Sequence, residues 1–97
     1  MKNISNYKTF ESEEILDLPL GWSGSDRYIY REYPFKDFLT AMGFLNGVAE
    51  LANKMNHHPK MTIDYNKVLV ATFTHDAGGV TYKDLELASV ANALYHP

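Results

Sequence analysis

The sequence contains no cysteine, which excludes disulfide bonds, thiolate metal sites and a cysteine nucleophile and is typical of a reducing compartment. It has no run of lysine or arginine, and its 12 acidic residues outnumber its 9 basic ones for a net charge of −3. We therefore predict no direct binding of nucleic acid. No stretch approaches the roughly 20 apolar residues of a membrane span, and the N-terminal residues show no signal-peptide pattern. Together these absences predict a cytoplasmic protein with no membrane association.

Length and composition indicate a single folded domain over residues 1–97. Of the 97 residues, 45% are hydrophobic and 22% are charged, which is typical of a globular protein. A chain of this length has material for one modest core and too little for two. The sequence shows no internal repeat, low-complexity tract or linker that would divide it.

Hydrophobic spacing predicts three helices. The strongest covers Phe35–Met55, where apolar residues recur at helical intervals between Pro34 and Asn56, a residue that suits a left-handed C-cap. A short helix is predicted over Phe10–Leu18 from its acidic first turn. A last helix is predicted after Thr81, which has the properties of a capping residue.

Alternating residues predict four strands in two hairpins. The first pair lies around Trp22 and over Arg27–Tyr33. The second pair, Met61–Tyr65 and Val68–Thr74, is predicted to turn at Asn66-Lys67. Because the strands come in consecutive pairs, the expected fold is α+β: a four-stranded antiparallel sheet with three helices packed on one face, in the order α-β-β-α-β-β-α.

Three of the four histidines, His57, His58 and His75, lie within one stretch of 24 residues, Asn53–Asp76. In the predicted hairpin Tyr65 lies opposite Val68, and the same register carried outward puts His58 opposite His75. Directly opposed residues point to the same side of a sheet. One side of this hairpin is apolar and is assigned to the core (Met61, Ile63, Tyr65, Val68 and Val70), whereas the mixed side, which carries His58, Phe73 and His75, is expected to be open.

Other interpretations of these residues are weighed against a catalytic one. Taken alone, His57 is better explained as a helix C-cap whose charge suits the dipole. Three histidines can hold zinc, but adjacent residues of an extended chain point apart, so we predict no metal site. Capping alone explains Asp84, and Phe73 is more often a packing residue than a ligand contact. The favoured interpretation is an acid–base site without a cofactor, since histidines supply both protonated and neutral imidazole near neutral pH.

Several motifs resemble those of the pterin-4a-carbinolamine dehydratases. The spacing of "NHHP" at 56–59 with Tyr65, His75 and Asp84 is similar to that family, and "GW", "FKDF", "YNKV" and "DLELAS" agree as well. The resemblance implies dehydration of 4a-hydroxytetrahydropterin to quinonoid dihydropterin without metal or organic cofactor. It further implies recycling of the pterin released by aromatic amino acid hydroxylases, and assembly as a homodimer or homotetramer.

The resemblance also implies roles for single residues. His57, His58 and His75 would bind the pterin and move its protons, without a fixed division into acid and base. Pro59 would direct His58, and Asp84 would support the site. Apart from the resemblance, we predict Phe73 of the open face as a further substrate-binding or supporting residue. Two positions depart from the family pattern: Asn53 stands where an acidic or other charged residue is common, and Met61 where an aromatic residue is common.

An alternative function is a non-catalytic interaction module, similar to family members that act as dimerisation cofactors and transcriptional coactivators. The apolar helix Phe35–Met55 would then contact a partner, together with three residues of the open face, Leu69, Ala71 and Phe73.

Overall fold

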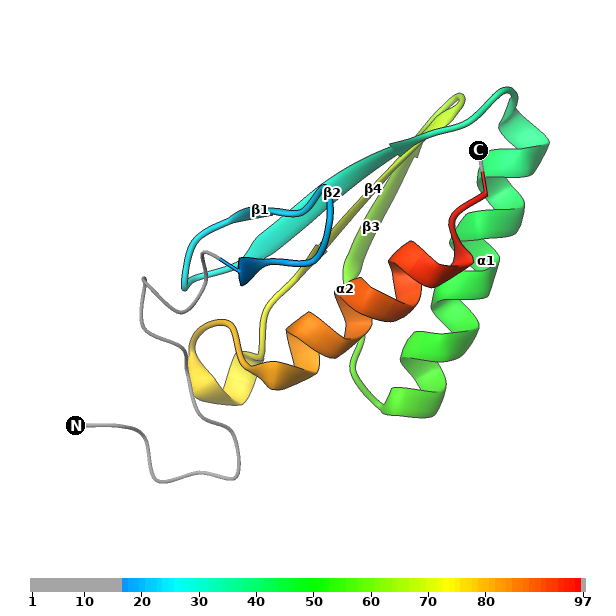
Figure 1. Cartoon of the computed structure of the whole chain (residues 1–97). Coiled ribbons are helices and arrows are strands. Elements are labelled where there is room, and N and C mark those ends of the chain that lie inside the picture. The colour runs from blue at the N-terminus through cyan, green and yellow to red at the C-terminus, as the bar shows by residue number, and fades with distance from the viewer. Residues whose placement is uncertain (1–16, 97) are drawn as a thin grey trace.

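The computed structural model describes residues 17–96, which form one sheet covered by helices on one face (Figure 1). The sheet has four antiparallel strands in the order β1-β2-β4-β3. The α+β class and the antiparallel four-stranded sheet are thereby confirmed. The described residues contain two α-helices, and the helix predicted over Phe10–Leu18 falls almost wholly outside them. The elements are β1 (Ser23–Gly24), β2 (Ile29–Pro34), α1 (Phe38–Met55), β3 (Lys60–Asp64), β4 (Lys67–Thr72), the 3-10 turn η2 (His75–Ala77) and α2 (Tyr82–Leu94).

Helix α1 begins three residues later than predicted. Phe35 instead continues β2 for one more hydrogen bond, because its N–H donates to the carbonyl of Asn66 in the β3–β4 turn at 2.8 Å. Asp37 is the N-cap, and its carboxylate accepts the backbone N–H of Thr40 at 2.8 Å. The end matches the prediction, since Asn56 adopts the left-handed conformation at the C-cap.

The turn between β3 and β4 lies one residue earlier than predicted. Ile63 pairs with Val68 and Asp64 with Lys67, so Tyr65 occupies the turn with a φ of 54°. The predicted pairing of Tyr65 with Val68 is therefore wrong, and Tyr65 is 65% exposed instead of facing the core. The physical reason is Lys67, which belongs to β4 and not to the turn, because it pairs with Asp64 of β3 on one side and with Pro34 of β2 on the other.

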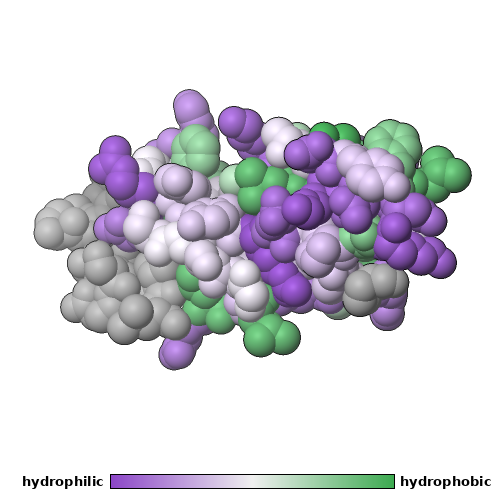
Figure 2. All heavy atoms as spheres, turned by 90° about the horizontal axis from the view of Figure 1, so that it is seen from above, coloured by the Kyte–Doolittle hydropathy of each residue, from purple (hydrophilic) through white to green (hydrophobic). Residues whose placement is uncertain are grey.

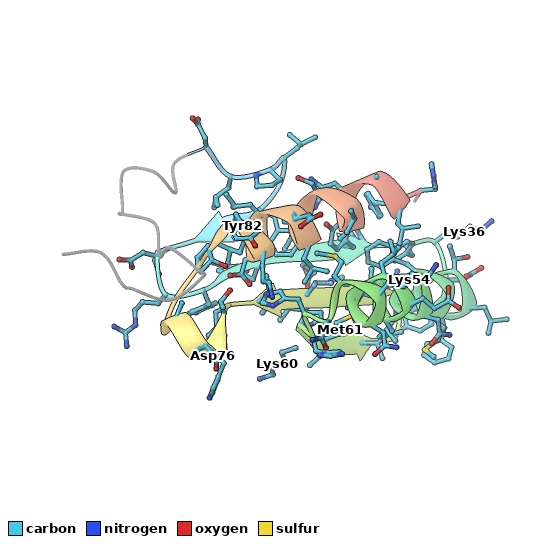
Figure 3. All side chains as sticks on the ribbon, turned by 90° about the horizontal axis from the view of Figure 1, so that it is seen from below. Lys36, Lys54, Lys60, Met61, Asp76 and Tyr82 are labelled. Carbon is cyan, nitrogen blue, oxygen red and sulfur yellow. The ribbon has the colours of Figure 1, made fainter. Side chains whose placement is uncertain are left out.

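The core lies between the sheet and the two helices. Tyr33 is fully buried at its centre, where its hydroxyl donates to Oδ1 of Asn92 at 2.6 Å and accepts from Nε1 of Trp22 at 3.0 Å. Asn92 thus attaches α2 to the sheet. Figure 3, which looks onto the helices, shows both of them lying over the sheet, with Lys36 and Asp76 toward opposite ends of the molecule.

The other face of the sheet is uncovered by helices. Seen from that side, hydrophilic and hydrophobic side chains intermingle (Figure 2). The exposed aromatic residues of this face are Tyr28, Tyr30 and Phe73. Among residues 17–96, no helix has the length and apolar character that a membrane crossing requires.

Candidate active site

Asp84 is the centre of a buried polar cluster behind the end of β4. It lies in the first turn of α2 and completes a capping box with Thr81, as the sequence suggested. Its Oδ1 contacts Nε2 of His57 at 2.6 Å and accepts the hydroxyl of Thr72 at 2.7 Å. Its Oδ2 accepts the hydroxyl of Thr74 at 2.8 Å and the backbone N–H of Thr81 at 2.9 Å. Four groups therefore converge on one carboxyl that is wholly shielded from solvent.

The hydroxyl groups fix the direction of the hydrogen bonds in this cluster. Thr74 donates its single hydroxyl proton to Asp84. In its 2.6 Å contact with Thr81, Thr74 therefore accepts the hydrogen bond from the Thr81 hydroxyl. Thr72 also donates to Asp84, so its oxygen acts as an acceptor toward Nε2 of His57 at 3.3 Å. Nε2 of His57 therefore carries a proton, shared between Asp84 and Thr72. No buried side-chain nitrogen or oxygen within the described part of the chain lacks a partner.

His58 faces the opposite way from its neighbour and is exposed. The left-handed Asn56 ends α1, and the chain then turns through His57 and Pro59 into β3. Nε2 of His58 lies 3.3 Å from Oδ1 of Asn53, one helical turn back. The residue that departs from the family pattern is thus in direct contact with a predicted catalytic histidine.

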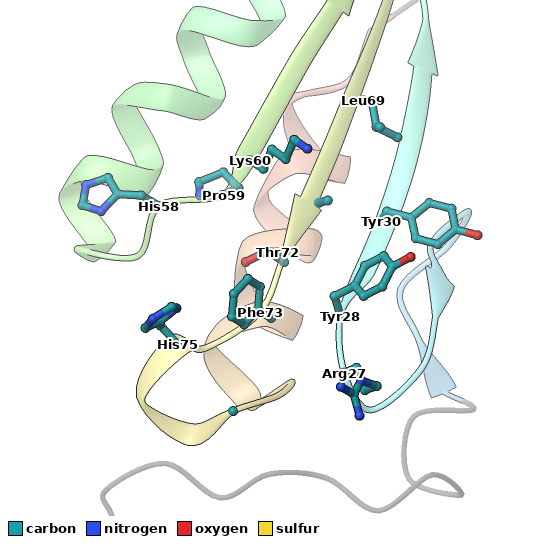
Figure 4. A pocket seen from close by; sticks show the side chains of 12 residues that line it. Arg27, Tyr28, Tyr30, His58, Pro59, Lys60, Leu69, Thr72, Phe73 and His75 are labelled. Carbon is teal, nitrogen blue, oxygen red and sulfur yellow. The ribbon is translucent and has the colours of Figure 1, made fainter.

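A cavity of about 970 Å³ on the open face joins His58 to His75. In Figure 4 both histidines stand at the same end, His58 before β3 and His75 at the start of η2. Phe73 contacts His75, with 5.6 Å between their ring centroids, and Pro59 also lines the cavity. Thr72 lines it as well and hydrogen-bonds Asp84, so one residue connects the cavity to the buried cluster.

The structure places the six predicted site residues in two groups. His58, His75, Pro59 and Phe73 line the cavity, whereas His57 and Asp84 lie buried behind it. The predicted register, with His58 directly opposite His75, is wrong because the hairpin turns one residue earlier. The ladder between β3 and β4 ends at the pair Lys60 and Ala71, so the two histidines share a cavity without being strand partners.

Sequence reasoning missed several residues around the cavity. Thr72 and Thr74 continue the alternation of Val68 and Val70 on the core side, and polar residues at core positions are a signal for a buried network. Tyr28 and Tyr30 were recognised only as strand residues. Within residues 17–96, no three histidine, cysteine, aspartate or glutamate side chains are grouped so as to hold a metal ion. Missed residues of the cavity wall are Arg27, Tyr28, Tyr30 and Lys60.

Comparison with known proteins identifies the family. Residues 5–94 match the family model described as pterin 4 alpha carbinolamine dehydratase. A Sulfurisphaera tokodaii protein, provisionally named a pterin-4-alpha-carbinolamine dehydratase, is 46% identical over 84 residues, covering 87% of this chain and 90% of that protein. A Haloarcula marismortui protein with the same provisional name is 45% identical over 83 residues, covering 84% of this chain and 90% of that protein.

A solved structure agrees with these relatives. The crystal structure of a Brucella melitensis protein described as a transcriptional coactivator/pterin dehydratase is 40% identical to this chain, with a TM-score of 0.80. The match covers 87% of this chain and 92% of that one. Sequence and fold therefore lead to the same conclusion: the chain belongs to the pterin-4-alpha-carbinolamine dehydratase family.

Proposed function

We propose that this protein dehydrates 4a-hydroxytetrahydropterin to quinonoid dihydropterin, using histidines as acid and base. The observation that carries the proposal is the cavity that exposes both His58 and His75 at one end. The C4a–O bond of the substrate breaks as an imidazolium donates a proton to the hydroxyl, which leaves as water. A neutral imidazole takes the N5 proton, and the N5 electron pair forms the new double bond to C4a. Protons balance over the turnover, and no electrons are exchanged with a second reactant.

His57 and Asp84 have a different place in the proposed mechanism. His57 is directed into the buried cluster, where Nε2 is occupied by Asp84 at 2.6 Å. A carboxylate in this position fixes the orientation of the imidazole and its Nε2 proton. We assign proton transfer to His58 and His75, and a positioning role to His57. Asp84 holds His57 and Thr72, and through Thr72 it supports the cavity wall.

A turnover assay tests the proposal. Wild-type protein should accelerate the loss of 4a-hydroxytetrahydropterin, followed by its ultraviolet absorbance, and His58→Gln or His75→Gln should lower the enzymatic rate by about 100-fold or more. His96→Gln is the matched control, because His96 is exposed and lies outside this cavity. A wild-type protein that leaves the spontaneous rate unchanged would disprove the activity.

The biological setting follows from the activity. Rapid dehydration would return the pterin to the reductive cycle that serves aromatic amino acid hydroxylases, in the cytoplasm and with no organic or metal cofactor of its own. Assembly as a homodimer or homotetramer remains a prediction, which light scattering coupled to size-exclusion chromatography checks.

Partner binding is the second candidate function. The first turn of α1 exposes Phe38 by 44% and Leu39 by 79%, and the Brucella protein is described as a transcriptional coactivator as well as a dehydratase. Under this alternative, Leu39→Glu would abolish capture of a partner while leaving pterin turnover intact. Loss of capture in His58→Gln instead would connect partner binding to the cavity and contradict the assignment to α1.

A further inference from the structure

The cavity extends well beyond the two histidines. Its volume of about 970 Å³ lies at the upper end of the range of roughly 300–1,000 Å³ for drug-sized ligands, and a bicyclic pterin ring is much smaller than such a ligand. Figure 4 shows Tyr28, Tyr30 and Arg27 on the side of the cavity away from His58 and His75, with Phe73 between the two groups. The cavity therefore has a second end that the proposed chemistry does not use.

The strand register explains how this second end reaches the histidine end. Tyr30 pairs with Ala71, and Ala71 pairs with Lys60, so these three residues form one row across β2, β4 and β3. Opposed residues point to the same face, and the small side chain of Ala71 leaves a trough between Tyr30 and Lys60. Two strand spacings of about 4.8 Å separate the outer members of the row by about 10 Å. A ligand lying across the trough would contact both walls.

The second end presents an aromatic surface beside a cation. The rings of Tyr28 and Tyr30 lie 5.8 Å apart between centroids and are tilted by 34°, and both are substantially exposed. Over residues 17–96, no hydrogen bond or ion pair involves the guanidinium of Arg27, whose backbone N–H alone is engaged by Ser25 at 3.1 Å. A guanidinium forms bidentate hydrogen bonds with carboxylates, and tyrosine rings stack on flat aromatic groups.

The backbone at this end is held in place before any ligand binds. Ser25 donates to the carbonyl of Tyr28 at 3.0 Å across a turn, and Val80 donates to the carbonyl of Asp26 at 2.9 Å. Gly24 allows this turn, because a Cβ there would lie 2.3 Å from the carbonyl oxygen of Tyr28. The turn that carries Arg27 and Tyr28 is thus attached to the segment following η2, and pre-organisation of this kind lowers the cost of binding.

We propose that Arg27, Tyr28 and Tyr30 form a subsite for an aromatic, carboxylate-bearing substituent at C6 of the pterin, as in the para-aminobenzoyl-glutamate portion of folates. The inference rests on the proposed function, since it places the pterin ring at His58 and His75. The methylene-amine link of such a substituent crosses the trough over Ala71, the benzoyl ring stacks on the tyrosines, and a carboxylate pairs with Arg27. The enzyme would then favour folate-type 4a-hydroxytetrahydropterins over those with short, neutral substituents.

Binding of stable oxidised probes tests the subsite on the full chain. By calorimetry, folic acid should bind about tenfold more tightly than 6-methylpterin. Added salt should lower the affinity for folic acid more than the affinity for 6-methylpterin. Arg27→Gln and Tyr28→Ala should each lower the affinity for folic acid about tenfold and leave that for 6-methylpterin unchanged. Lys36→Gln and Tyr82→Ala are matched controls outside the cavity, and both should bind folic acid as the wild type does.

The outcomes separate this inference from the proposed function. Equal affinities for the two probes, or an affinity ratio unaffected by Arg27→Gln and Tyr28→Ala, would overturn the subsite, whereas turnover of 4a-hydroxy-6-methyltetrahydropterin would still support the dehydratase. Tighter folic acid binding that depends on both residues, with no turnover of either type of substrate, would support the subsite and reject the dehydratase. Failure of both probes to bind would overturn the subsite.

Discussion

At the scale of single residues, the carboxyl group of Asp84 connects the predicted site to the core. It accepts four hydrogen bonds in a solvent-excluded cluster. Asp84→Asn would replace an acceptor by an amide whose NH₂ group faces other donors, so we expect a loss of about 3 kcal/mol in the free energy of unfolding. Urea denaturation measures it, with Glu86→Gln on the exposed side of α2 as the control. A loss below about 1 kcal/mol would contradict the assigned hydrogen-bond pattern.

Asn53 is the second residue whose contact yields a prediction. Its Oδ1 lies 3.3 Å from Nε2 of His58, so Asn53→Glu would introduce a negative charge beside that imidazole. An adjacent carboxylate favours the imidazolium, and His58 of the variant should remain protonated at higher pH than in the wild type. NMR titration of the histidine ring protons measures this shift. Asn46→Glu, at an exposed position of α1, should leave the His58 titration unchanged.

At the scale of elements, the start of α1 depends on the charge of Asp37. Hydrogen bonds from Thr40 hold the pKa of Asp37 below its ordinary value of 3.8. A lowered folded-state pKa means that the cap stabilises the protein above about pH 3.8 and that this contribution is lost as pH falls through the folded-state pKa. Asp37→Ala should therefore lower the thermal midpoint at pH 7, and the difference from wild type should shrink below pH 3.8.

Asp37→Asn provides the matched comparison for this pH dependence. Asparagine is also a good N-cap but does not titrate. The thermal midpoint of Asp37→Asn should stay above that of Asp37→Ala at every pH, including below pH 3.8. A difference between wild type and Asp37→Ala that persists undiminished in acid would contradict the role of the carboxylate.

The elements also show what the sequence can specify. The end of α1 and the α+β order were predictable because caps and hydrophobic period are local signals, whereas the predicted start of α1 was three residues too early. The turn position was not, since Lys67, predicted in the turn, is held in β4 by its pairing with Pro34, a residue 33 positions away. The predicted turn was one residue too late, which shifted each cross-strand partner by two positions. Because two residues are the period of a strand, every hydrophobic residue of β3 and β4 was still predicted on its correct face. Only Tyr65 was misplaced into the core.

The candidate site was predictable to the same extent. Motif spacing identified His57, His58, His75 and Asp84, but not that the first and last of these turn away from the cavity together. His57 and Asp84 lie behind the cavity because they share hydrogen bonds with Thr72 and Thr74 of a distant segment. No local sequence pattern predicts these contacts. The remaining wall of the cavity comes from β2 and the turn before it, which lie near the histidines because of the strand order β2-β4-β3.

At the scale of the whole molecule, the attachment of α2 to the sheet depends on a polar cluster inside the aromatic core. Oδ1 of Asn92 accepts from Trp22, Arg31 and Tyr33 at 3.1, 2.8 and 2.6 Å. The Arg31 guanidinium also lies 4.4 Å above the centre of the Tyr33 ring. Tyr33→Phe would remove one donor and one acceptor from this cluster, so we expect a loss of about 1–2 kcal/mol in the free energy of unfolding at pH 7.

The same substitution should change how the whole molecule responds to alkali. Burial raises the pKa of Tyr33 above its ordinary value of 10.0, so above that pH the unfolded chain loses this proton before the folded protein does. The wild type therefore loses stability as pH rises from about 10 toward the folded-state pKa, and phenylalanine removes this contribution. Unfolding by urea at pH 8 and pH 11 should show a smaller difference between wild type and Tyr33→Phe at the higher pH. Tyr82→Phe, at an exposed position, should show the same difference from wild type at both pH values. If the difference in free energy of unfolding between wild type and Tyr33→Phe stays constant or grows from pH 8 to pH 11, the Tyr33 hydroxyl is not the group whose pKa burial raises.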